Sequence, residues 1–350
     1  MGAALKGFGK GFAENLIRTT SNPFVALFIG ILATSTIQSS SCTTSIVVGM
    51  VSSGVITVDN AVYIVMGANI GTTVTNTIVS LAHMTRRDEF RRAISVASMH
   101  DFFNFVCVCL LLPLELATGF IKKCAHGMAT LFGNVGGIKF TSPIKLATEP
   151  AVHFIRNMMQ FLIKHLFTGE IYVYIFVLIV SVLMLFLSLY FLVKVMKSLV
   201  IKRAEIILDN VVTRSRLLGL FAGLIFTIIV QSSSVTTTLL VPLAAAGVIA
   251  IETAFSITMG ANIGTTTTAI LASFATGNIS AIVVAFEHFL FNTIGVLIVF
   301  PIRAIRMIPI NLAKSLGNLA YNKRRYAFIY VLSVFFFIPA LLIFISKCFK

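Results

Sequence analysis

Two clusters of hydroxyl and amide side chains occur twice in this chain, each time between apolar runs. The first copy reads Gln-Ser-Ser-Ser at 38–41 and Gly-Ala-Asn-Ile-Gly-Thr-Thr at 67–73, and the second repeats both motifs at 231–234 and 260–266. Both motifs repeat at the same offset of 193 residues, which indicates an internal duplication. Because a polar cluster between apolar runs is costly in a membrane, we expect these clusters to bind something polar.

The serines suit an anion such as phosphate, which needs many hydrogen-bond donors. Six hydroxyls, together with backbone N–H groups at half-helix N-termini, would supply them. The expected phosphate ligands are these serines and the asparagines of the second motif: Ser39, Ser40, Ser41, Ser232, Ser233, Ser234, Asn69 and Asn262.

Oxygen-bearing side chains in the same motifs suit an alkali cation, which is held by hydroxyls, amide carbonyls and unwound backbone C=O groups. No lysine or arginine lies within either apolar core, so a bound anion would have to be neutralised by co-bound cations. Coupling of the anion to cations is therefore expected on electrostatic grounds. Residues of the required kind are Gln38, Gln231, Thr72, Thr265, Thr268, Asn69 and Asn262.

A structural interpretation of each motif is open at this point. Hydroxyl clusters often join closely packed membrane helices, and Gly-x-x-x-Gly is commonly a helix contact motif. A His-x-x-x-Asn pair also occurs twice, as His100 with Asn104 and His288 with Asn292, and such a pair can act as a structural brace. The joint repetition of both motifs nevertheless favours binding.

The composition predicts that these motifs lie in a polytopic helical membrane protein. Of the 350 residues 57% are apolar and only 11% are charged, and the mean hydropathy is +0.98. The net charge of +15 does not indicate nucleic acid, because the basic residues lie between apolar runs, where they would contact anionic lipid headgroups.

The apolar runs on both sides of each Gln-Ser-Ser-Ser motif are about half a membrane span long, which predicts re-entrant hairpins. Crossings are expected at 60–83 and 252–275, each broken by its Gly-Ala-Asn-Ile-Gly motif. Three crossings between the hairpins, at 60–83, 94–114 and 171–193, would invert the second copy relative to the first. The expected fold is all-α, with two inverted-topology repeats.

Basic residues predict the orientation, since 16 of them fall in the loops on one side and 11 on the other. The richer side is placed in the cytoplasm of a multi-pass plasma membrane protein (inner membrane if bacterial). The expected order is an amphipathic N-terminal segment (1–22), repeat 1 (23–114), an extracellular loop with amphipathic helices (115–169), a connecting transmembrane helix with a cytoplasmic loop (170–216), repeat 2 (217–300), and a cytoplasmic loop with the last transmembrane helix (301–350).

These motifs resemble the type II sodium-phosphate cotransporters over about residues 22–340. The paired Gln-Ser-Ser-Ser motifs, the segments at 67–77 and 260–270, Glu89-Phe90-Arg91-Arg92-Ala93 and the run from His100 to Asn104 are similar to that family. The resemblance implies sodium-driven uptake of inorganic phosphate by alternating access, with both hairpins around one site. It also implies sodium ligands at Gln231, Ser232, Thr265 and Thr268. The segment 115–169, with one cysteine, departs from the long disulfide-bonded loop of larger members.

Asp101 breaks the symmetry between the copies, because its counterpart after His288 is Phe289. A carboxylate in a membrane helix is costly, so two interpretations are open. Asp101 either lies near the cytoplasmic end, where it is hydrated or pairs with Arg91 or Arg92, or it holds an additional sodium ion. The resemblance favours the second, since members with aspartate here move net charge in each cycle, and this predicts electrogenic transport.

Two rival functions are also considered. A cation channel would use the carbonyls of the Gly-Asn-Ile-Gly-Thr-Thr segment as a filter, but such filters normally need several symmetric copies. A membrane sensor would bind phosphate without concentrating it. No nucleophile–base pair or metal motif is visible, so neither an enzyme nor an organic cofactor is expected, and the oligomeric state stays open.

Overall fold

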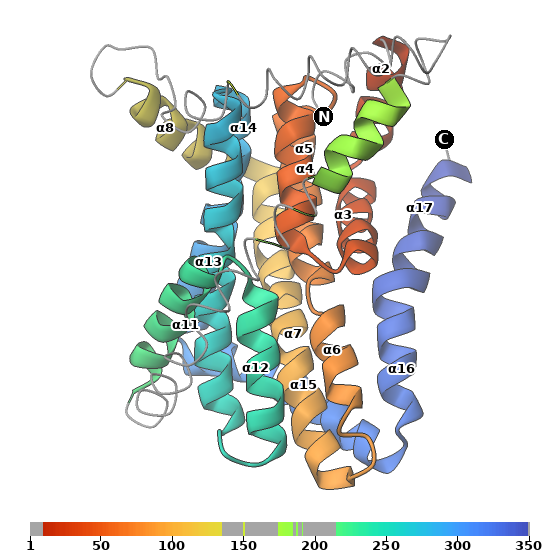
Figure 1. Ribbon diagram of the computed structural model, residues 1–350, viewed down its shortest axis with the longest axis vertical. Coiled ribbons are helices and arrows are strands. Elements are labelled where there is room, and N and C mark those ends of the chain that lie inside the picture. The colour runs from red at the N-terminus through yellow and green to blue at the C-terminus, as the bar shows by residue number, and fades with distance from the viewer. Residues whose placement is uncertain are drawn as a thin grey trace.

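The computed structural model describes residues 10–134, 150, 174–184, 187, 191 and 215–348, and every regular element in these ranges is helical (Figure 1). Four of the helices are long and apolar enough to cross a membrane: Val58–Leu81, Arg87–Thr118, Ile279–Val299 and Arg325–Ser346. The expected all-α polytopic membrane protein is confirmed at this level.

Several predicted segments lie outside the described residues. They are the chain start at 1–9, the part of the predicted extracellular loop beyond residue 134 except residue 150, and the cytoplasmic loop at 194–214. The crossing predicted at 171–193 is described only in part, where Tyr174–Met184 forms an apolar helix.

Two helical hairpins carry the Gln-Ser-Ser-Ser motifs. The first joins α3 (Pro23–Ile37) to α4 (Ser40–Ser52), and the second joins α11 (Arg216–Val230) to α12 (Ser233–Ala245). The turns have the same geometry, because Gln38 and Gln231 both adopt left-handed backbone angles with φ of 57°. In Figure 1, α4 rises from its turn towards the upper end of the molecule, whereas α12 descends from its turn towards the lower end.

The helices after the hairpins differ between the copies. In the first copy, α5 (Val58–Gly71) ends and α6 (Val74–Leu81) begins, so the helix is interrupted at 72–73. In the second, α13 (Ile251–Thr276) is one continuous helix. The prediction of a broken helix in both copies is therefore wrong for the second.

The glycines of the second motif have a packing role that does not depend on a break in the helix. A Cβ added at Gly67 would collide with the carbonyl oxygen of Leu27 in α3, and one at Gly260 would collide with that of Leu220 in α11. These glycines thus allow the helix backbones to touch. They serve close packing in both copies, as the helix-contact interpretation stated.

The second helix of each hairpin packs against helices of the other copy. The second hairpin helix α4 packs against α13 and α14 (Ile279–Val299), and α12 packs against α6 and α7 (Arg87–Thr118). The first helices of the hairpins, α3 and α11, instead pack against α5 and α13 of their own copy, so each hairpin joins the two copies. The crossing in α7 is longer than the predicted 94–114, because Arg87 begins the helix and the left-handed Gly119 ends it.

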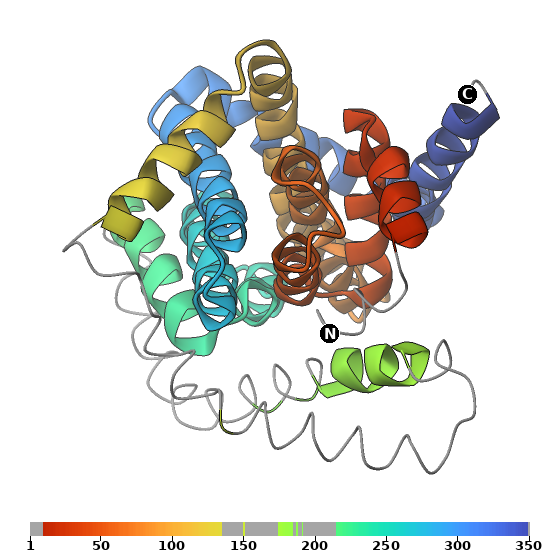
Figure 2. The same cartoon turned by 90° about the horizontal axis from the view of Figure 1, so that it is seen from above.

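The remaining helices surround this centre. The helix α8 (Phe120–Asn134) packs on α14, and α2 (Lys10–Thr20) precedes α3. The segment predicted as a cytoplasmic loop contains helix α15 (Arg303–Asn322), which packs along α7. The last span comprises α16 (Arg325–Val331), the π-helical segment η1 (Leu332–Phe337) and α17 (Ile338–Cys348), which lies beside α3 at the edge of the bundle (Figure 2).

Candidate functional site

The serines after each left-handed glutamine lie at a helix N-terminus. The Ser39 hydroxyl accepts a hydrogen bond from Cys42 N at 3.2 Å, and the Ser232 hydroxyl accepts one from Val235 N at 3.4 Å. Ser40 and Ser233 are the first residues of α4 and α12, and each is 4% exposed. The positive ends of two short helices, with their unpaired N–H groups, therefore accompany the predicted serine ligands.

The repeated His/Asn pairs join the two copies to each other. His100 Nε2 lies 2.9 Å from Asn262 Oδ1, and His288 Nε2 lies 3.3 Å from Asn69 Oδ1. Because an amide oxygen only accepts, the histidine nitrogen is the donor in both bonds. Each histidine thus reaches into the other copy, which is the structural brace that the sequence left open.

The second residue of each pair bonds within its own copy, and Asn104 Oδ1 also accepts from Asn262 Nδ2 of the other copy at 3.2 Å. Asn104 Nδ2 donates to the backbone oxygen of Asn69 at 2.8 Å, and Asn292 Nδ2 donates to that of Asn262 at 2.7 Å. Asn69 and Asn262 are buried and bonded through side chain and backbone. The two asparagines predicted to bind phosphate are thus also the joints between the copies.

Two of the predicted sodium ligands, Gln231 and Thr268, contact each other in the second copy. The Thr268 hydroxyl donates to Gln231 Oε1 at 3.0 Å, and Thr268 is 6% exposed, so it does not face lipid. The buried Thr265 hydroxyl has no hydrogen-bond partner in the described part of the chain. Thr265 and Thr268 share one face of α13 at i, i+3 spacing, and hydroxyl and amide oxygens are ligands that a cation can use.

The first copy lacks this arrangement. Gln38 is exposed, and the Thr72 hydroxyl donates to the backbone oxygen of Ala68 at 3.0 Å. Thr75, the counterpart of Thr268, has a buried hydroxyl without a partner among the residues that the structure describes. The contact between glutamine and threonine therefore distinguishes the second copy.

Asp101 lies buried in α7 with 3% exposure. Its Oδ2 accepts a hydrogen bond from the hydroxyl of Tyr330 in α16 at 2.9 Å, while Oδ1 has no partner within the described ranges. Arg91 lies 3.6 Å from Asp88, and Arg92 binds backbone oxygens of α12. The interpretation in which Asp101 pairs with Arg91 or Arg92 is thus wrong.

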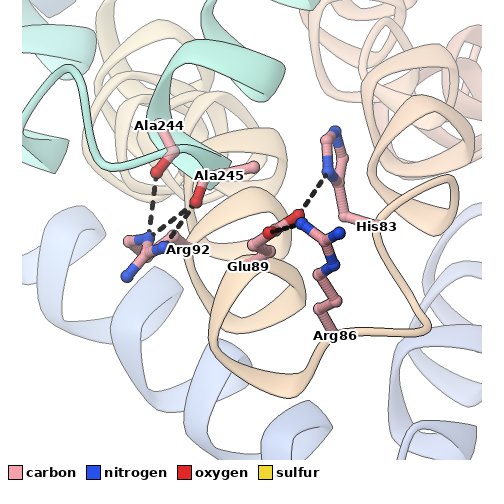
Figure 3. Close-up of polar contacts among 6 residues, drawn as sticks. All are labelled: His83, Arg86, Glu89, Arg92, Ala244 and Ala245. Carbon is pink, nitrogen blue, oxygen red and sulfur yellow. Dashed lines mark hydrogen bonds and ion pairs between the residues drawn. The ribbon is translucent and has the colours of Figure 1, made fainter.

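Arg92 of α7 connects the copies at the C-terminal end of α12, the end of the second hairpin that is farther from its turn (Figure 3). Its Nε donates to Ala245 O at 2.9 Å and its Nη2 donates to the same oxygen at 2.6 Å, with a further Nε contact to Ala244 O at 3.1 Å. A cation is favourable at the C-terminal end of a helix, where carbonyls lack intrahelical partners. Glu89 in the same helix does not pair with Arg92. Its Oε1 accepts a hydrogen bond from Arg86 Nη1 at 2.7 Å, and its Oε2 lies 3.4 Å from His83 Nδ1.

The sequence did not single out three buried polar residues, which are Asn76, Thr237 and Glu287. Thr237 in α12 donates to Asn76 Oδ1 in α6 at 3.0 Å, which is another bond between the copies. Glu287 in α14 is fully buried, and neither carboxylate oxygen has a partner in the described structure. A carboxylate inside the apolar run 279–300 was a visible signal, of the kind that singled out Asp101.

Comparison with known proteins gives one consistent result. Residues 1–139 and 184–307 match the Na+/Pi-cotransporter family. The sodium-dependent phosphate transport protein 2A of Rattus norvegicus is 36% identical over 402 residues, covering 97% of this chain and 63% of that protein. Protein 2B of Homo sapiens is 34% identical over 414 residues, covering 95% and 60%. This chain thus spans less than two thirds of the length of either relative, and no solved structure matches it significantly.

Proposed function

Because the chain belongs to the Na+/Pi-cotransporter family, we propose that it couples inward sodium movement to the uptake of inorganic phosphate. The observation that carries the proposal is the reciprocal pair of bonds from His100 to Asn262 and from His288 to Asn69. These bonds bring the second motifs of both copies into one centre. Relatives named as sodium-dependent phosphate transport proteins support the same cargo.

The proposed phosphate ligands are Ser39, Ser40, Ser41, Ser232, Ser233 and Ser234. Their place at the N-termini of α4 and α12 supports this, because backbone N–H groups and the helix dipole both favour an anion there. Asn69 and Asn262 remain in the proposal as residues of the same site, which position the copies through their histidine partners in this conformation.

The proposed sodium ligands lie mainly in the second copy and comprise Gln231, Ser232, Thr265 and Thr268. The contact of Thr268 with Gln231 and the unpartnered Thr265 hydroxyl support them. Gln38 and Thr72 are their counterparts in the first copy. Asp101 is proposed to hold an additional sodium ion through Oδ1, while Tyr330 occupies Oδ2.

The proposed mechanism is alternating access between two inverted repeats with re-entrant hairpins, in a plasma membrane. Three features support it: the equal turn geometry at Gln38 and Gln231, the opposite directions of α4 and α12, and the packing of these two helices on helices of the other copy. Divalent phosphate with two sodium ions would be neutral. A third ion at Asp101 would therefore make the cycle electrogenic.

Reconstitution into vesicles tests this function. With an inward sodium gradient, radiolabelled phosphate should enter and saturate, and replacement of sodium by potassium should abolish uptake. A sensor would bind phosphate without accumulating it, and a channel would pass ions without saturable phosphate uptake. Either of these results would contradict the proposed symport.

A further inference from the structure

Glu287 is a carboxylate that neither the proposed phosphate site nor the proposed sodium site uses. It lies in the crossing formed by α14, and its exposed fraction is 0%. Neither Oε1 nor Oε2 has a hydrogen-bond partner among the residues described. An ionised carboxylate buried in this way is strongly unfavourable, so the group needs either a ligand or a proton.

The surroundings of Glu287 suit an uncharged side chain. Phe286 and Val283 of α14 form an apolar cluster with Ala125 and other residues of α8, and Leu290 packs against it. Counted from the paired histidines, the counterpart of Glu287 in the first copy is Met99, which is also 0% exposed. The fold thus places an apolar side chain of similar length at the equivalent position.

The charged groups around Glu287 do not neutralise it. Those that act on it are Glu115 of α7, Asp59 of α5 and Lys122 of α8, and it acts in turn on Tyr63 of α5. Lys122 is already bound to Asp59 at 2.7 Å, and Glu115 accepts from the backbone N–H of Ile121 at 2.6 Å. The cation among these three groups is therefore already paired and supplies no counter-charge to Glu287.

The remaining titratable groups on helices packed against α14 do not pair with Glu287. They either have partners of their own or lie near the C-terminal end of α14. In α7, His100 and Asp101 have the partners described above, and α4 contributes the buried thiol of Cys42. Glu252 of α13 binds Lys314, and Arg306 of α15 donates to the backbone oxygen of Phe300, just beyond the C-terminal end of α14.

An open pocket lies one helical turn from Glu287. Its volume is about 430 Å³, and its wall includes Val283, four residues before Glu287 on the same face of α14. Side chains that exchange protons or carry charge line the same pocket: Asp59, Lys122, Lys123 and His126. The pocket is at the end of the molecule where α8 lies, which the sequence predicts to be extracellular.

We propose that Glu287 is a proton-binding site loaded from this pocket during the transport cycle. A hydronium ion in the pocket transfers its proton to a carboxylate oxygen of Glu287 and leaves as water. The neutral acid is then buried in the position that Glu287 occupies in the structure. A sodium ion would need several oxygen ligands at once, whereas a proton needs only the carboxylate.

Infrared spectroscopy of the purified protein in lipid tests the bound proton without requiring transport. The spectrum of the parent minus that of Glu287→Gln should contain the C=O stretch of a protonated carboxylic acid at neutral pH. The matched control Glu252→Gln should remove bands of an ionised carboxylate, because Glu252 is partly exposed and paired with Lys314. Two results would overturn the proposal. One is bands of an ionised carboxylate in the difference spectrum of parent minus Glu287→Gln, and the other is loss of the acid band when sodium is added at constant pH.

Uptake measured at several external pH values tests whether the proton is exchanged during the cycle, which rests on the proposed function. The ratio of Glu287→Gln to parent uptake should rise severalfold with pH, because glutamine stays neutral while the parent must recover its proton. A ratio that does not change with pH would contradict the exchange.

Glu287→Met, which copies Met99, replaces the glutamine variant if that variant does not fold. A parent without sodium-dependent uptake would refute the proposed function, and the infrared result would still decide the protonation.

Discussion

His100 Nε2 lies 2.9 Å from Asn262 Oδ1, although the two residues are 162 positions apart and belong to different copies of the duplicated unit. Its counterpart, the bond from His288 to Asn69, runs in the opposite sense between the same two copies. The two histidines therefore exchange partners across the molecule. This crossing makes each copy depend on the other for the hydrogen bonds of its own asparagine.

Loss of one of these bonds should lower stability. His100→Ala leaves the buried Asn262 oxygen without its donor, and such a loss costs about 1–3 kcal/mol. Thermal unfolding of the detergent-solubilised protein would show a lower midpoint, and the double variant with Asn262→Ala should cost less than the sum of the two single changes. The exposed His126 provides a control, since His126→Ala should leave the midpoint unchanged. Strictly additive effects at His100 and Asn262 would contradict the bond.

Thr268→Val should weaken sodium activation of uptake severalfold, because valine keeps the shape and removes the oxygen that contacts Gln231. Thr75→Val is the matched control in the first copy, where the hydroxyl has no partner within the described residues. The measurement is the sodium concentration that gives half-maximal phosphate uptake. Equal shifts in the two variants would contradict a sodium site that is assembled only in the second copy.

Ser40→Ala and Ser233→Ala should each weaken apparent phosphate affinity. A hydrogen bond to a charged group is worth about 1.5–3 kcal/mol, so the expected change is roughly tenfold to a hundredfold. These positions test binding more cleanly than Ser39 and Ser232, whose hydroxyls cap α4 and α12 and whose loss also lowers helix stability. Phosphate dependence of uptake measures the effect, and unchanged affinity after replacement of all six serines would refute the assignment.

Asp101→Gly should keep phosphate uptake but abolish its dependence on membrane potential, because the proposed third sodium ion loses its carboxylate. Tyr330→Phe removes the hydrogen bond to Oδ2 and keeps the charge, so voltage dependence should survive in that variant. Uptake would be followed in vesicles whose potential is set by potassium and valinomycin. If the glycine variant responds to voltage as the parent does, Asp101 does not hold the additional ion.

Much of the fold follows from local signals in the sequence. Half-length apolar runs around Gln38 and Gln231 predict short helices, and the structure has them at α3, α4, α11 and α12. Continuity of α13 was not predictable from its glycines, because the same Gly-x-x-x-Gly spacing serves a break or a close contact. The glycines make close contacts in both copies, at Gly67 with Leu27 and at Gly260 with Leu220, and only the backbone of α13 shows that its helix continues.

The site was predictable in composition but not in pairing. Spacing along the chain places His100 near Asn104, yet it does not reveal that His100 bonds Asn262 in the other copy. The resemblance to a known family grouped Thr268 with Gln231 as expected sodium ligands, and the hydrogen bond between them is visible only in the structure. Glu287 was visible as a carboxylate in an apolar run, but its lack of partners depends on how α5, α7 and α8 pack around it.

Concentrative phosphate uptake tests the central claim most directly. Vesicles containing the purified chain would receive equal phosphate inside and outside, with sodium higher outside. The account predicts that internal phosphate rises above external phosphate, and that reversing the sodium gradient drives phosphate out. Phosphate that stays at its equilibrium distribution under both gradients would contradict sodium-coupled transport by this chain.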